Sequence, residues 1–316
     1  MKKVSLIAAL LLCTTLSGCA GSTKDETVQD QDVAYQQAMD VGSQALAIER
    51  YSVAEKSYRE ATRLALRRND VGAIGDASYN LAVTQLAADE PSDALQTVQN
   101  ARSALAMRQG SEAHATAGGL PQSSHGAETV ESDSGALSLV AAASAFRLND
   151  LGTAAREARV ATQSPDTDVA LRGAFVQGLV AARQHDSTTL MSAIGTIQSA
   201  KPPQSAVQKG DLAELQACYS LNSNPQQAMN HAADAVSLRR ETGDYRAMAR
   251  ALALEAQAAR QAGQGQRANA LLAQAAQSLG ARAGTDADTD PLAAQYMREA
   301  GSMAPIQPFK ARETTP

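Results

Sequence analysis

One glycine pattern in the chain could bind a cofactor, but its surroundings argue against that chemistry. Gly263, Gly265 and Ala268 match the loose dinucleotide-binding spacing, which requires a strand before the glycines and a helix after them. Here an alanine-rich segment, residues 247–262, comes first, so we interpret the glycines as the turn of a helical hairpin. The sequence contains no phosphate-binding loop, zinc-protease helix, serine-hydrolase elbow or Cys-x-x-Cys pair. We therefore expect no cofactor and no enzymatic activity.

The histidines and the last cysteine also favour structural roles. His231 and Asp234 share one face of an expected helix, which is more typical of a surface pair than of a catalytic one. His114 and His125 have no cysteine nearby and no helical i,i+4 spacing, so we expect no metal site. Cys218 follows Ala217 in an expected helix and is interpreted as a small core residue rather than a nucleophile.

The first 18 residues have the pattern of a secretory signal peptide. Met1-Lys2-Lys3 is positively charged, an apolar run follows over residues 4–12, and small residues come after it. The run is shorter than the roughly 20 apolar residues that a membrane-spanning helix needs. We expect residues 1–18 to be removed on export.

The segment Leu16-Ser17-Gly18-Cys19 resembles the lipobox of bacterial lipoproteins. The resemblance implies that Cys19 becomes the first mature residue and carries the lipid, which would anchor the chain firmly. Ala20, in place of an aspartate, implies sorting to the periplasmic face of the outer membrane of a Gram-negative bacterium. The alternative is an ordinary signal peptide followed by an unrelated cysteine. Residues 19–31 are mostly polar and are expected to form a flexible tether.

The composition of the 316 residues indicates an all-α fold. Hydrophobic residues make up 44% of the chain but aromatic residues only 3%, with no tryptophan, and alanine is the dominant apolar type. The formal net charge is −5 and basic residues are not clustered, which argues against a nucleic-acid partner. Once the leader is removed and Cys19 is lipidated, Cys218 alone remains, so an intramolecular disulfide is excluded.

An internal repeat organises residues 32–280. Each unit has small residues in a first helix, a polar turn, and small residues in a second helix, as in Gly42, then residues 50–52, then Ala54 and Ala61. Corresponding positions recur about 40 residues apart, with one longer interval between the second and third units. The second-helix positions in order are Ala54, Ala94, Ala154, Leu190, Ala228 and Ala268. This period is typical of stacked helical hairpins.

The pattern resembles the tetratricopeptide repeat (TPR) family. The family's small position in the first helix falls on Gly42, Ala82, Ala142, Gly178 and Ala256, while its tryptophan is absent and unit five has Gln216 instead of a small residue. The resemblance implies an all-α, right-handed α-solenoid of about six helical hairpins: repeats 1–2 over residues 32–108 and repeats 3–6 over 135–280. The alternative is a set of unrelated alanine-rich hairpins.

Two further segments complete the expected organisation. Residues 109–134 contain paired glycines, a proline and no apolar periodicity, and we expect a disordered insertion. In residues 281–316, Asp290-Pro291 predicts the start of a short helix that caps the last repeat, between a linker and a disordered tail. Basic residues followed by turn formers at 66–70 and 238–244 predict two helix ends.

In TPR proteins the first helices of the repeats line a concave groove, and the resemblance places candidate groove residues accordingly. They are Tyr79, Phe146, Arg147, Arg250, Gln257 and Arg260. Their apolar and cationic side chains would suit a peptide with an acidic end. Arg250 and Arg260 are expected to point to roughly the same face, and the alternative is that both are ordinary solvated residues.

The leading functional hypothesis is a membrane-anchored periplasmic scaffold or adaptor that binds other proteins or peptides. The resemblance to TPR lipoproteins extends this to envelope, secretion or pilus assembly. The alternative is a glycan- or small-ligand-binding lipoprotein for uptake, although the absence of tryptophan disfavours a sugar platform. A lytic enzyme would need an added catalytic domain, and no residues are left to build one.

Overall fold

The computed structural model describes residues 33–116, 125–201, 204–280 and 291–300, and within these ranges it contains thirteen α-helices and no strand. The expected all-α class is confirmed. The helices are α1 (Val33–Ala47), α2 (Tyr51–Arg68), α3 (Val71–Ala87), α4 (Pro91–Thr116), α5 (His125–Arg147), α6 (Leu151–Ala161), α7 (Thr167–Arg183), α8 (Ser187–Gln198), α9 (Ala206–Ser220), α10 (Pro225–Thr242), α11 (Tyr245–Gln261), α12 (Gly265–Gly280) and α13 (Pro291–Glu299).

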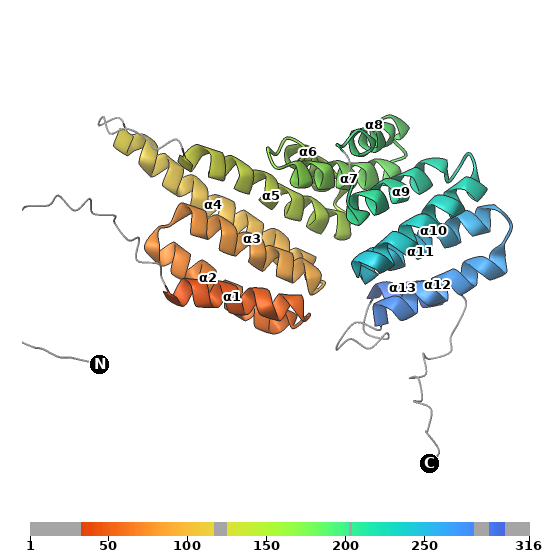
Figure 1. Cartoon of the computed structure of the whole chain (residues 1–316), viewed down its shortest axis with the longest axis horizontal. Coiled ribbons are helices and arrows are strands. Elements are labelled where there is room, and N and C mark those ends of the chain that lie inside the picture. Colours follow the sequence, from red (N-terminus) through yellow and green to blue (C-terminus); the bar gives the residue numbers. More distant parts are fainter. Residues whose placement is uncertain (1–32, 117–124, 202–203, 281–290, 301–316) are drawn as a thin grey trace, which may run out of the picture.

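Each helix packs against the next one along the chain, and helices α3, α5, α7, α9 and α11 also contact one another in sequence. This arrangement is consistent with a helical repeat. In Figure 1 the helices form an arch whose two ends bend toward each other. We call helices α1–α4 the N-terminal arm and helices α10–α13 the C-terminal arm.

One type of turn recurs in five hairpins, with the same period as the sequence repeat. Glu49, Asp89, Asn149, His185 and Gly263 end the first helices of five hairpins, and all five have positive φ. Each donates its backbone N–H three residues back, and the following residue donates five residues back, as in Arg50 N to Ala45 O at 2.9 Å. This is the Schellman helix end, in which a left-handed residue satisfies the last carbonyl groups. The turn at Gly263 has α11 before it and no strand, which confirms that the glycine pattern is a hairpin turn.

Small residues allow the helices of a hairpin to approach closely. The repeated alanines, including Ala54, Ala94, Ala154 and Ala268, are fully buried. A Cβ added at Gly42 would lie 2.7 Å from the ring of Tyr58, and one added at Gly178 would lie 2.6 Å from Leu215. The small residues that recur along the sequence are therefore required by the close packing of the helices.

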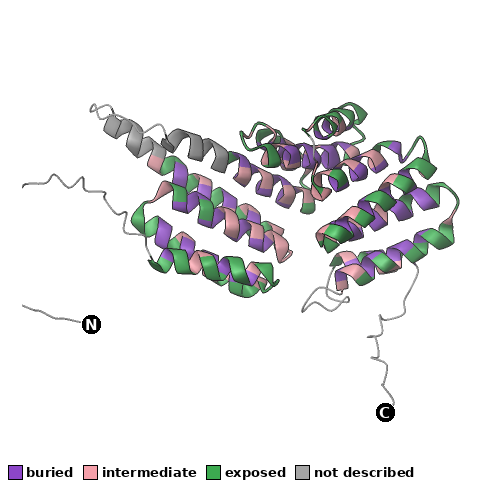
Figure 2. Cartoon of the chain, in the orientation of Figure 1, coloured by how far each residue is buried: buried purple, intermediate pink, exposed green. Residues whose placement is uncertain are grey.

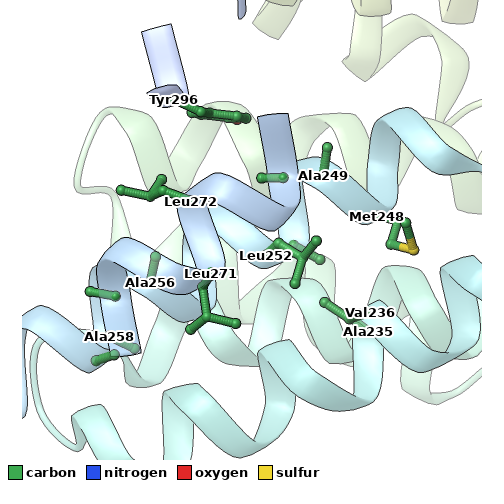
Figure 3. Close-up of a cluster of buried hydrophobic side chains, with 14 of the residues drawn as sticks. Ala235, Val236, Met248, Ala249, Leu252, Ala256, Ala258, Leu271, Leu272 and Tyr296 are labelled. Carbon is green, nitrogen blue, oxygen red and sulfur yellow. The ribbon is translucent and has the colours of Figure 1, made fainter. Parts of the chain in front are cut away.

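Buried residues face neighbouring helices, and exposed residues lie toward the outer surfaces (Figure 2). One hydrophobic cluster joins α1 to α5, and another joins α9 to α13. In the second, Leu252, Leu271, Leu272 and Tyr296 bring α11, α12 and α13 together (Figure 3). A helix is thus present where the capping helix was expected: α13 packs against α12, with Ala293 and Tyr296 buried.

Part of the segment that was expected to be a disordered insertion is helical. Helix α4 continues to Thr116 and α5 begins at His125, so residues 109–116 and 125–134 are helical. The alanine, glutamate and glutamine residues of these stretches favour helix, and continuation from an existing helix avoids the cost of nucleation. Residues 117–124 lie outside the described residues, as do residues 1–32, on which the expected signal peptide, Cys19 and the expected tether fall, and residues 281–290 and 301–316, on which the expected linker and tail fall. Within the described residues, no helix combines the length and apolar character needed to cross a bilayer.

Candidate binding site between the arms

Five charged side chains form a chain of alternating sign across four helices. Asp211 and Glu214, one turn apart on α9, are buried together with Arg239 of α10. Arg172 of α7 donates to both carboxylate oxygens of Asp211 at 2.6 and 2.7 Å. Arg239 bonds Asp211 and reaches Glu214 at 3.3 Å, and Arg250 of α11 donates to both oxygens of Glu214.

This charge chain, defined as Arg172, Asp211, Arg239, Glu214 and Arg250, surrounds an aromatic ring. The ring of Phe175 lies 5.2, 5.4 and 5.7 Å from the guanidinium carbons of Arg172, Arg239 and Arg250. Cation–π attraction and the two carboxylates together offset the cost of burying these charges. Three cations meet two anions, so the charge chain carries one net positive charge.

The two ends of the charge chain remain partly accessible. The side chains of Arg172 and Arg250 keep 35% and 34% of their exposure, whereas Arg239 keeps 1%. Burial alone would lower the pKa of Arg250, but the paired Glu214 raises it overall above its ordinary value. Arg172 and Arg250 therefore present permanent charges held in fixed positions.

Arg239 was predicted only as a basic residue at a helix end. It does stand in the last turn of α10, and Gly243 ends that helix with φ of 72°. However, its side chain is buried, and its Nε has no hydrogen-bond partner among the described residues. A Cβ at position 210 would lie 3.4 Å from this group, so the guanidinium packs closely against the backbone of α9 at Gly210.

Arg250 and Arg260 contact different helices instead of sharing one face. Ten residues at 100° each leave the two Cβ positions about 80° apart around the helix axis. Arg250 turns toward Glu214 of α9, whereas Arg260 donates to the Glu299 carbonyl of α13 at 2.6 Å. Because the carbonyl groups at the end of a helix carry partial negative charge, Arg260 acts as a cap for α13.

A second group of charges joins the two arms. Asp89 lies in the turn between α3 and α4, and Arg246 lies in the first turn of α11; their side chains pair at 2.8 Å. Arg147, the last residue of α5, lies 3.7 Å from Asp89 and also bonds the carbonyl of Leu86. Burial and the neighbouring Arg246 lower the pKa of Arg147 to about 10, with Asp89 opposing.

A pocket of about 200 Å³ lies at this junction. Its walls come from both arms and from the end of α5: Glu49, Tyr51, Ala87, Arg147, Gly243, Asp244, Tyr245 and Arg246. Sequence reasoning missed Arg246 and Asp89. The one available signal was the presence of an arginine in the first turn of a helix, where the macrodipole disfavours a cation.

The remaining predicted groove residues have mixed environments. Tyr79 on α3 is half-buried, and burial followed by the charge of Asp166 raises its pKa, with Arg172 opposing. Phe146 packs between two hydrophobic clusters, and the guanidinium carbon of Arg183 lies 5.9 Å from the ring centre. Gln257 is exposed on the same stripe of α11 as Arg246 and Arg250.

We call Tyr79, Arg147, Arg172, Arg246, Arg250 and Tyr296 the inner-face cluster. Its members come from α3, α5, α7, α11 and α13, and they influence one another electrostatically. Arg250 acts on the pKa of both Arg147 and Tyr296, although burial is the largest cause and raises the pKa of Tyr296 to about 12. Of the residues in this cluster, Arg147 and Arg246 line the pocket between the arms, together with Tyr51 and Tyr245.

Among the described residues, no group of three or more histidine, cysteine or acidic side chains could hold a metal ion. Burial, with the charge of Glu214, raises the pKa of the Cys218 thiol to about 12, which keeps it in its unreactive protonated form.

Comparison with known proteins assigns no family: no protein-family model matches the chain, and no curated protein matches it.

Proposed function

We propose that this protein is a lipid-anchored scaffold that faces the periplasm and binds other proteins or peptides between its two arms. The observation that carries the proposal is the inner-face cluster, whose arginines and Tyr79 keep partial exposure and act on one another electrostatically although they come from separate helices. Tyrosine and arginine are the residue types enriched where proteins bind one another. A partner segment with acidic residues would complement the arginines.

The fold supports this proposal in its finer form, a TPR-like solenoid of six hairpins. Five hairpins share one Schellman turn, the repeated alanines are buried, and first helices contact first helices along the arch. Repeats of this kind typically bind extended chains or helices along the surface that their first helices form. The long helices α4 and α5 interrupt the period at the position of the longer interval.

The proposed address depends on the N-terminal sequence. Lys2 and Lys3, the apolar run and the lipobox-like segment ending at Cys19 together support export, lipidation and outer-membrane anchoring. Such an anchor would hold the arch close to the membrane through a short polar tether. Envelope, secretion or pilus assembly are processes that need a scaffold of this kind.

Co-purification from cross-linked cells tests the proposal. The tagged wild type is compared with Tyr79→Ala combined with Gln257→Glu, which alters the space between the arms. The matched control combines Val160→Ala on the outer helix α6 with Gln163→Glu in the turn that follows it, and both residues are exposed. We expect the first variant to lose the proteins captured by the wild type and the control to keep them, with melting temperatures verified for both. Equal capture by all three proteins would refute binding between the arms.

A further inference from the structure

The contact between the arms differs in kind from the contacts within them. Within each arm, neighbouring helices are joined by buried hydrophobic clusters, but among the described residues no such cluster includes both arms. Between the arms, the structure shows instead the ion pair of Asp89 with Arg246 and the pocket around it. Polar contacts of this kind break without exposing apolar surface.

The helix that carries Arg246 and the turn that carries Asp89 do not require a charged residue at these positions. Arg246 stands in the first turn of α11, where a cation is unfavourable for the helix. Asp89 stands at the left-handed position of a hairpin turn, with φ of 68°, where other hairpins have Glu49, Asn149, His185 or Gly263. The pairing across the arms offsets the unfavourable position of the Arg246 charge.

The contact between the arms also brings two cations close together. Closure brings Arg246 next to Arg147, and one carboxylate, that of Asp89, lies between the two cations. The lowered pKa of Arg147, caused first by burial and then by Arg246, is consistent with this crowding. Because the pair is polar and partly exposed, changes in its surroundings can open it at little cost.

We infer that Asp89, Arg246 and Arg147 form a salt-sensitive latch between the arms, and that the open form admits the partner to the inner face. This inference rests on the proposed function and specifies how the same site is regulated. The Debye length falls from about 10 Å at 0.1 M salt to about 3 Å at 1 M, so salt weakens this partly exposed pair. A partner segment that carries carboxylates would compete with Asp89 for the two arginines in the same way.

Distance measurements between the arms test the latch. Spin labels are attached to cysteines at the exposed positions Ser92 of α4 and Ser237 of α10, in the full mature chain carrying Cys19→Ser and Cys218→Ser. We expect one narrow inter-label distance at 50 mM NaCl and a second, longer distance with at least a third of the population at 1 M NaCl. The variant Asp89→Asn should show the longer distance at 50 mM NaCl.

The matched control is Asp93→Asn, which removes the same charge from an exposed position in the first turn of α4. It should keep the narrow distance of the wild type. The latch is refuted if salt leaves the wild-type distance unchanged, or if Asp89→Asn and Asp93→Asn give the same distribution. Because this experiment requires no partner, its failure would leave the co-purification result standing. Conversely, if the co-purification experiment finds no partner that binds between the arms, the distances expected between the spin labels stay the same.

Discussion

Arg250 holds Glu214 through both of its carboxylate oxygens, and this pairing joins α11 to α9 beside the ring of Phe175. The same carboxylate also accepts from Arg239, so one buried glutamate pairs with two arginines from different helices. The contact fixes the spacing of three helices at the centre of the proposed binding surface. Arg250 was predicted as a cation of the groove, and the structure shows that it also pairs with a buried carboxylate and so helps to hold the helices together.

Glu214→Gln should destabilise the fold by about 3–5 kcal/mol, because it leaves Arg250 without its charge partner and leaves the buried Arg239 with Asp211 alone, which Arg172 also shares. Chemical denaturation followed by circular dichroism measures the change. The control is Glu241→Gln, which alters an exposed glutamate on α10 and should stay within about 0.5 kcal/mol of the wild type. Equal stabilities for the two variants would show that the charge chain contributes nothing.

Charge reversal at Arg250 and at Arg260 should have different effects on stability, although the sequence suggested one shared role for the two arginines. Arg250→Glu places a third carboxylate beside Glu214 and Asp211 and should cost about 3 kcal/mol or more. Arg260→Glu removes an exposed contact with α13 and should cost about 1 kcal/mol or less. Hydrogen exchange should show faster opening of α13 in the second variant alone. Comparable losses of stability would contradict the divergence of the two side chains.

Gly178→Ala should destabilise the fold by about 1–3 kcal/mol, because the new methyl group would lie 2.6 Å from Leu215 and force the helices apart. Gly195→Ala in α8 is the matched control, since a Cβ there meets nothing within 4 Å. It should stabilise the fold by about 0.5–1 kcal/mol through helix propensity. If both substitutions shift the denaturation midpoint in the same direction, the close-packing explanation is wrong.

The repeat, the hairpin turns and the capping helix could be predicted because they follow local rules. Ala54, Ala94 and Ala154 recur with the period of the packing, and a positive-φ residue ends five of the first helices. The charge chain could not be predicted in this way. Asp211 and Arg239 pair across two helices, and nothing in their separation along the chain indicates a partner. Arg239 looks identical to Arg240, its exposed neighbour, until the packing of α9 is known.

The helical stretches 109–116 and 125–134 show a second limit of local reasoning. Their composition lacks apolar periodicity, which suggested disorder, but their helix-favouring residues extend α4 and α5 without a new nucleation step. Among the predicted groove residues, exposed Gln257 kept the expected accessibility. Arg250 and Phe146 are engaged in contacts that only the three-dimensional arrangement reveals.

Cys218 should react slowly with thiol reagents in the native protein. Burial, together with Glu214, raises its pKa to about 12, so the thiolate fraction at pH 8 is far below that of an unfolded chain. The raised pKa means that reactivity should increase as the pH rises toward 12. In a Cys19→Ser background, we expect modification at pH 8 to be at least about tenfold slower in buffer than in denaturant. Equal rates would show that the thiol is accessible and ordinary.

Site-specific photo-cross-linking tests the central claim most directly, namely that partners bind between the arms of an anchored scaffold. A photoreactive amino acid is placed at Gln257, exposed on the inner stripe of α11, or at Val160, exposed on the outer helix α6, in the full-length protein within living cells. The account predicts discrete protein adducts in the membrane fraction from position 257 and none of the same size from position 160. Identical adducts from both positions, or adducts from position 160 alone, would contradict it.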